Sequence, residues 1–141
     1  MGSLMEEVIS LVWAKAENDG IKIHRQCREL PKLYLDTGLI KTCIFNVILN
    51  AFQAMPSGGE LTVSTKASDS IASIIIEDSG IGVSKENLPK LFDLFFSTKS
   101  TGLGLGLAMT KRIVEEHGGK VDFQSIEGKG STVTISLPMK K

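Results

Sequence analysis

Hydrophobic residues recur every three or four positions in several stretches of the chain, and this spacing predicts amphipathic helices. The three long predicted helices are Leu4 to Asn18, Asp36 to about Met55, and one that ends at Gly118-Gly119. In the middle helix, apolar residues between 39 and 54 cover most of the circumference, so this helix is expected to be largely buried. In the last helix, Leu105, Met109 and Ile113 mark one apolar face. A shorter helix is predicted for residues 84 to 91.

Alternating apolar and polar residues predict five strands between these helices. The predicted strands are residues 21–27, 61–65, 71–77, 121–126 and 131–137. Helices and strands in this order favour an α/β two-layer sandwich. We expect a mixed, mostly antiparallel sheet of about five strands with the helices on one face.

Composition limits the class of protein. The chain has 141 residues, of which 42% are hydrophobic, and its sixteen basic and sixteen acidic residues cancel. Neither a nucleic-acid partner nor a membrane contact is indicated, because there is no basic excess and no apolar run of about 18 residues. Residues 1–3 are interpreted as left over from expression, and residues 4–141 as one domain. Two cysteines, Cys27 and Cys43, lack metal-ligand spacing, which favours a reduced, cytoplasmic protein.

Four polar residues interrupt predicted buried positions. Asn46 and Asn50 lie four apart on the buried helix, and an unpartnered buried amide costs roughly 1–3 kcal/mol. They require structural partners, a ligand or a metal. Asp78 continues the inward parity of Ile74 and Ile76, either as a ligand group or as the cap of a turn. Ser131 is also expected to point inward, because it lies two residues before Val133 and four before Ile135 and therefore shares their face of the strand.

Two glycine clusters bracket a phenylalanine-rich stretch. They are Asp78-Ser79-Gly80-Ile81-Gly82 and Gly102-Leu103-Gly104-Leu105-Gly106-Leu107, with Leu91 to Lys99 between them. Glycine lets the backbone approach a ligand closely, and a helix that begins at the second cluster would direct its N–H groups at an anion. Neither the Walker pattern nor the dinucleotide pattern G-x-G-x-x-G occurs. The clusters therefore indicate a nucleotide pocket of another fold class.

In this order, the motifs resemble the ATP-binding catalytic domain of bacterial two-component sensor histidine kinases. Asn46 to Ala51 resembles the family's N box, the two glycine clusters resemble its glycine boxes, and Leu91 to Lys99 resembles its F box. The family has the Bergerat (GHKL) fold, shared with gyrase, mismatch-repair ATPases and a heat-shock chaperone. The amino-acid sequences of residues 50–56 and 95–99 are similar to those of the nitrogen-regulation branch of these kinases.

The resemblance implies roles for the matching residues. Asn50, and with it Asn46, would hold Mg²⁺, and Asp78 would accept a hydrogen bond from the adenine amino group, with Ser131 nearby. Gly80 and Gly82 would let the base lie against the backbone. The residues implied in phosphate contact are Gly102, Gly104, Leu105 and Gly106. Lys99 would be a phosphate cation that, like Asn46, takes part in transfer. Gln53 and Leu103 depart from the family pattern, and each removes one candidate phosphate contact.

The implied reaction is transfer of the γ-phosphoryl group of ATP to a histidine on a separate dimerising helical hairpin, with a response regulator downstream. Neither His24 nor His117 resembles the acceptor box. His117, at a helix end, is expected to have a packing role, and His24 has no adjacent acidic residue to orient it.

The alternatives share the fold. One is an ATP-hydrolysing conformational switch of the gyrase type, which needs a glutamate base where this chain has Asn46. The others are a nucleotide-binding switch that only binds and an anti-sigma-type serine kinase.

Overall fold

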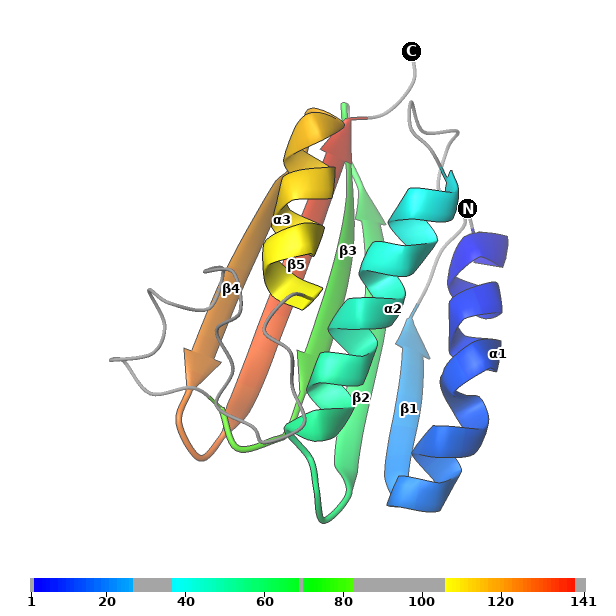
Figure 1. Cartoon of the computed structure of the whole chain (residues 1–141), viewed down its shortest axis with the longest axis vertical. Helices are drawn as coiled ribbons and strands as arrows, with labels where there is room; N and C mark the ends of the chain where they lie inside the picture. Colours follow the sequence, from blue (N-terminus) through cyan, green and yellow to red (C-terminus); the bar gives the residue numbers. More distant parts are fainter. Residues whose placement is uncertain (1, 27–36, 69, 83–105, 139–141) are drawn as a thin grey trace.

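The computed structural model describes residues 2–26, 37–68, 70–82 and 106–138, which form a five-stranded sheet with three helices on one face (Figure 1). The elements are α1 (Gly2–Asp19), β1 (Ile21–Gln26), α2 (Thr37–Gln53), β2 (Gly59–Ala67), β3 (Ile71–Asp78), α3 (Gly106–Glu116), β4 (Lys120–Ile126) and β5 (Gly130–Pro138). The predicted two-layer sandwich is confirmed. The predicted short helix at 84–91, Cys27 and Asp36 lie outside the described residues.

The strand order across the sheet is β1-β2-β3-β5-β4. β1 and β2 are parallel and are joined through α2, whereas β2–β3, β3–β5 and β4–β5 are antiparallel pairs. A parallel pair needs a crossover of this kind, while antiparallel pairs need only turns. The prediction of a mixed, mostly antiparallel sheet is therefore confirmed.

The core lies between the inward face of the sheet and the three helices. Alternate residues of β2, β3 and β5 are buried, and their partners across the sheet form apolar rows, such as Ile74 opposite Ile135 and Ile76 opposite Val133. The outward face carries no helix in the part of the chain that the structure describes (Figure 1). Many of the strand positions on that face hold residues with hydroxyl groups. A half-buried sheet of this kind accounts for the clear alternation in the sequence.

α2 is the central helix of the covering layer and packs against both α1 and α3. Most of the apolar residues predicted to be buried are so, but Leu39 is 42% exposed and that part of the prediction is wrong. Leu39 lies in the first turn of the helix. The helix ends at Gln53 rather than at Met55, because Pro56 cannot continue the backbone hydrogen bonding.

The apolar face predicted for α3 is confirmed only in part. Ile113 packs against the core, but Met109 is 42% exposed, and Leu105 lies outside the described residues. Thr110 and Val114, which the prediction did not include, are fully buried. The buried face of α3 is therefore rotated by about one residue from the predicted face. The prediction missed this because a threonine, which a hydropathy pattern counts as polar, occupies a core position. The predicted end of the helix is confirmed, since the Gly119 N–H donates to the Val114 carbonyl.

Replacing Thr110 by valine is expected to stabilise the protein. Thr110 Oγ1 is buried and has no hydrogen-bond partner of normal geometry among the described residues, and a buried hydroxyl in that state costs about 1–3 kcal/mol. Its neighbour across the α2–α3 contact is the Cys43 thiol, whose pKa is raised by burial and lowered in part by this hydroxyl. Thr110→Val should raise the free energy of unfolding in urea by about 1 kcal/mol, and Thr134→Val on the outward face should change it little. Equal or lower stability of Thr110→Val would contradict the expectation.

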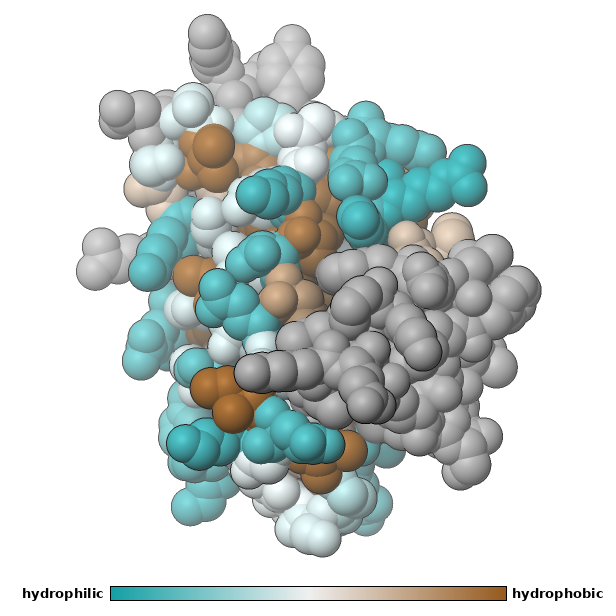
Figure 2. Space-filling model, turned by 90° about the vertical axis from the view of Figure 1, so that its left-hand side faces the viewer, coloured by the Kyte–Doolittle hydropathy of each residue, from teal (hydrophilic) through white to brown (hydrophobic). Residues whose placement is uncertain are grey.

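The described surface is mainly hydrophilic on the side of β4 and α3, with apolar residues scattered between the polar ones (Figure 2). Exposed apolar side chains of α3 and β4 include Met109 and Ile126, and single exposed residues of this kind are normal on a protein surface. Among the described helices, none has the length and apolar character that crossing a bilayer requires.

Candidate nucleotide site

One end of the sheet's inward face is polar while the rows beside it are apolar. Asp78 on β3 lies opposite Ser131 on β5, and Ser131 lies opposite Ser125 on β4. In the next row the corresponding residues are Ile76, Val133 and Phe123. Side chains directly opposite on neighbouring strands are close enough to interact. Three polar side chains from separate strands therefore meet at this end of the core.

Ser131 is only 8% exposed, which confirms the predicted inward orientation. Its Oγ lies 2.8 Å from Ser125 Oγ, and Ser125 Oγ donates to the Gly130 carbonyl at 3.0 Å. Ser125 was not singled out from the sequence. Its parity with Val121 and Phe123 was visible, but its position beside Ser131 depends on the β4–β5 register.

The loop after β3 is held by the carboxylate of Asp78. Asp78 Oδ1 accepts a hydrogen bond from the Gly80 N–H at 2.8 Å, so the turn-capping interpretation of this residue is confirmed. The same loop is tied to the end of α2, because the Ile81 N–H donates to the Ala54 carbonyl at 2.9 Å. Asp78 is half-buried, and its carboxylate has a defined orientation at the edge of the core.

Gly80 and Gly82 fit where no other residue would. A Cβ atom on Gly80 would collide with the Ala54 carbonyl, and one on Gly82 would collide with the Ile126 carbonyl. Gly82 also has φ +70°, a conformation that other residues rarely adopt. The loop is thus wedged between the end of α2 and the β4–β5 hairpin. Both glycines are required by contacts within the chain, and their contact with a base stays a prediction.

Asn46 and Asn50 are half-buried on the side of α2 that faces α3. Cys43, three residues before Asn46, lies against Thr110 of α3 and fixes how the two helices align. Since α2 and α3 run antiparallel (Figure 1), the residues before Thr110 lie beside the residues after Cys43, so the first turn of α3 lies near the level of Asn46. Gly106, an expected phosphate-binding residue, is the first residue of α3. A helix N-terminus beside two amide groups is a suitable environment for an anion and its counter-ion.

The amide oxygens of Asn46 and Asn50 fit a magnesium ion in donor type. Mg²⁺ takes oxygen ligands, and in nucleotide sites it uses few protein groups together with phosphates and waters. Within residues 2–26, 37–68, 70–82 and 106–138, no group of three or more His, Cys, Asp or Glu residues could hold a metal. The expected site residues Lys99, Gly102, Gly104 and Leu105 lie outside these ranges.

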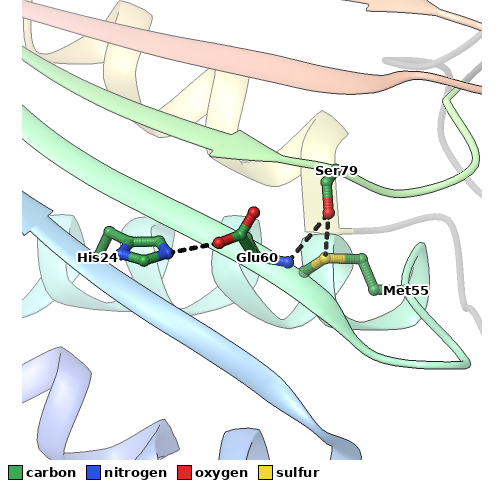
Figure 3. A network of polar contacts seen from close by, with 4 residues as sticks. All are labelled: His24, Met55, Glu60 and Ser79. Atoms are coloured by element: carbon green, nitrogen blue, oxygen red, sulfur yellow. Dashed lines mark hydrogen bonds and ion pairs between the residues drawn. The ribbon is translucent and has the colours of Figure 1, made fainter.

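His24 has an acidic partner that the sequence did not indicate. Its Nε2 lies 2.9 Å from Glu60 Oε1 on the neighbouring strand (Figure 3), so the expectation that no carboxylate orients it is wrong. The parallel β1–β2 pairing places these two residues, 36 apart in sequence, side by side on the outward face. Both side chains are exposed and the sheet separates them from Asn46 and Asn50.

Glu60 also connects this pair to the loop after β3. Its backbone N–H donates to Ser79 Oγ at 3.0 Å, and the Ser79 hydroxyl lies 3.7 Å from Met55 Sδ (Figure 3). In return the Ser79 N–H donates to the Glu60 carbonyl. The residue next to Asp78 is therefore anchored to β2 and to the segment that follows α2.

His117 has the packing role expected from its place at a helix end. It is half-buried, and its Nδ1 lies 2.7 Å from the Ile113 carbonyl in the last turn of α3. The Ile113 carbonyl also accepts a hydrogen bond from the His117 backbone N–H at 3.2 Å, so the ring adds a second contact at the end of the helix.

Residues 35–141 match the family described as histidine kinase-, DNA gyrase B-, and HSP90-like ATPase, and the chain belongs to this family. All the site residues named above fall within the matched range. The resemblance inferred from the four motifs is thereby confirmed at the level of the family.

The chain is also similar to sensor kinases and their solved catalytic domains. It is 36% identical over 141 residues to the signal transduction histidine-protein kinase AtoS of Escherichia coli strain K12, covering 99% of this chain and 23% of AtoS. The catalytic domain of histidine kinase ThkA, in a nucleotide-free form, has a TM-score of 0.87 at 27% identity, covering 99% and 94% of the two chains. Full-length ShkA in complex with AMPPNP has a TM-score of 0.88 at 25% identity, covering 99% of this chain and 30% of ShkA.

Proposed function

We propose that this chain is the catalytic part of a sensor histidine kinase, which binds ATP with Mg²⁺ and donates the γ-phosphoryl group to a histidine on a separate helical hairpin. The observation that carries the proposal is the polar end of the sheet, where Asp78 and Ser131 face the covering helices, in a chain that matches the ATPase family. A similar fold was solved with AMPPNP bound in ShkA.

The adenine end of the proposed site is the row that contains Asp78. A carboxylate accepts hydrogen bonds and donates none, so it selects a base with an amino group at the facing position. The hydrogen bond from the Gly80 N–H fixes the orientation of the carboxylate before a ligand arrives. An acceptor that is already oriented loses little side-chain entropy on binding.

The phosphate end is the flank of α2 beside the first turn of α3. Asn50 and Asn46 would hold Mg²⁺, which when bound neutralises phosphate charge and orients the transferred group. The backbone N–H groups that begin at Gly106 would bind phosphate oxygens. We include Lys99, Gly102, Gly104 and Leu105 in this end on the strength of their motifs alone.

The acceptor histidine belongs to another domain. His24 is paired with Glu60 on the outward face, and His117 contacts the Ile113 carbonyl at the far end of α3. His24 is separated from Asn50 by the sheet, and His117 is at the opposite end of α3 from Gly106. A dimerising hairpin, and downstream a response regulator, are the partners that this function requires.

A hydrolysing switch is less well supported because no suitable base is present among the described site residues. Such an enzyme needs a group that takes a proton from water near the phosphates. The residue one helical turn before Asn50 is Asn46, an amide, and Glu60 lies on the outward face beside His24. No specific observation favours a serine kinase of the same fold.

The test is transfer to a hairpin supplied separately. The chain is mixed with γ-labelled ATP, Mg²⁺ and the helical hairpin of a sensor kinase, and label should accumulate on the hairpin and not on the chain. A hairpin whose acceptor histidine is replaced by glutamine should stay unlabelled, and a His24→Ala, His117→Ala double variant should transfer as well as the unaltered chain. Acid-labile, alkali-stable phosphate on the chain itself would contradict the proposal.

A further inference from the structure

We propose that the free edge of β1, together with the hollow between β1 and α1, binds an extended acidic segment of another polypeptide as an additional strand of the sheet. The inference does not depend on the proposed nucleotide site, because Asp78 and Ser131 of that site lie on β3 and β5.

β1 is at one end of the sheet, and among the residues that the structure describes β2 is its only neighbouring strand (Figure 1). The direction of its backbone groups follows from the register. Ile21 lies opposite Gly59, and the Gly59 N–H donates to the Gly20 carbonyl at 3.3 Å. In a parallel pair, Gly59 then bonds to the residues on either side of Ile21, so the N–H and C=O groups of Ile21, Ile23 and Arg25 are directed away from β2. A row of such groups is open to pairing with a further strand.

A hollow of about 350 Å³ lies beside this edge. It is lined by residues 21–24 of β1 and by Trp13, Ala16 and Glu17 of α1. Consecutive residues of a strand point to opposite faces of the sheet, so a hollow lined by four of them follows the edge of the strand rather than one face. An added strand would lie about 4.8 Å from β1 and would occupy this space.

Trp13 gives the hollow an apolar wall of defined orientation. Its side chain is 43% exposed, and its Nε1 donates to Glu17 Oε1 at 2.8 Å, one turn further along α1. Alternate side chains of an added strand would share the inward direction of the buried Ile21 and would pack against the tryptophan ring. An aromatic ring whose polar group already has a partner is a suitable apolar anchor for such an interface.

The charges of β1 favour an acidic partner. Its six residues include three basic ones, Lys22, His24 and Arg25, and no carboxylate. His24 is paired with Glu60 and Arg25 with Glu6, whereas Lys22 is exposed and has no carboxylate partner among the described residues. A carboxylate on the outward face of the added strand would pair with Lys22, since opposite charges on neighbouring strands attract.

A second copy of this chain is disfavoured as the occupant. Pairing of two β1 strands would bring their basic side chains together, and like charges on neighbouring strands are destabilising. Basic residues on an edge strand therefore prevent self-association, while the hollow beside them still accepts a strand of opposite charge.

The test is titration of the chain with two acetylated peptides of the length of β1, one of alternating valine and glutamate and one of alternating valine and lysine. Trp13 is the only tryptophan in the chain, so its fluorescence reports on the hollow. The glutamate peptide is expected to shift the emission to shorter wavelength and to bind about tenfold more tightly than the lysine peptide.

Three variants separate charge from backbone pairing. Lys22→Glu is expected to reverse the preference between the peptides. Lys120→Glu is the matched control and should leave the preference unchanged, because Lys120 is an exposed lysine on β4, at the other end of the sheet. Ile23→Pro should abolish binding of both peptides, because proline removes an N–H that is directed to the free edge. The thermal midpoint of each variant shows whether the fold is kept.

Binding of neither peptide, or equal affinity for both, would overturn the inference. Self-association of the unaltered chain that Ile23→Pro abolishes would also overturn it, because the edge would then bind a second copy instead of an acidic partner.

Discussion

Asp78→Asn is expected to lower the affinity for ATP by about a hundredfold and to narrow the difference between ATP and GTP, because about 1.4 kcal/mol corresponds to a factor of ten. The carboxylate offers only acceptors to the adenine amino group, and a hydrogen bond to a charged acceptor contributes roughly 1.5–3 kcal/mol. Asparagine replaces one acceptor by an NH₂ group, which loses this bond and suits the 6-oxo group of guanine.

The fold should survive this substitution. The hydrogen bond from the Gly80 N–H to Asp78 Oδ1 can be kept by the amide oxygen of asparagine. Asp122→Asn, an exposed position on β4, is the matched control and should not change either affinity. Calorimetry with both nucleotides on the three proteins decides the matter. If the unaltered chain binds GTP as tightly as ATP, Asp78 serves only to cap the turn.

Asn50→Ala is expected to abolish the strengthening of ATP binding by Mg²⁺, whereas Asn46→Ala should reduce it less. Removing a group that binds or orients a metal ion typically costs about 10-fold to 100-fold in affinity. Both asparagines are half-buried on the flank of α2 that faces α3. Asn50 is one helical turn nearer than Asn46 to the loop that follows Asp78. The measurement is the dissociation constant of ATP with Mg²⁺ and with a chelator.

Gln53→Ala is the matched control for this experiment. Gln53 is an exposed amide three residues after Asn50 on the same helix, and its removal should leave the response to Mg²⁺ unchanged. Equal affinity of the unaltered chain for ATP with and without Mg²⁺ would contradict the assignment of both asparagines as magnesium ligands.

Local pattern was sufficient to predict the strands and the inward parity of Asp78 and Ser131. In a sheet with one covered face, side-chain direction alternates with period two, so parity along a strand reports burial directly. The pattern was misleading for α3, where Thr110 occupies a core position and Met109 does not. Residue type indicates burial only when the core is apolar throughout, and this core contains a threonine.

The sequence by itself determined the family and the α/β class, because the order of motifs and elements can be followed along the chain. It also determined the two asparagines of α2 and the glycine-flanked aspartate, because each of these is encoded within one short segment. Only the tertiary structure decided which distant segments became neighbours. The order β1-β2-β3-β5-β4 brings Ser125 to Ser131 and Asp78, and the parallel pairing of β1 with β2 brings His24 to Glu60. Periodicity specifies the face on which a side chain lies, but the strand order and register specify what lies beside it.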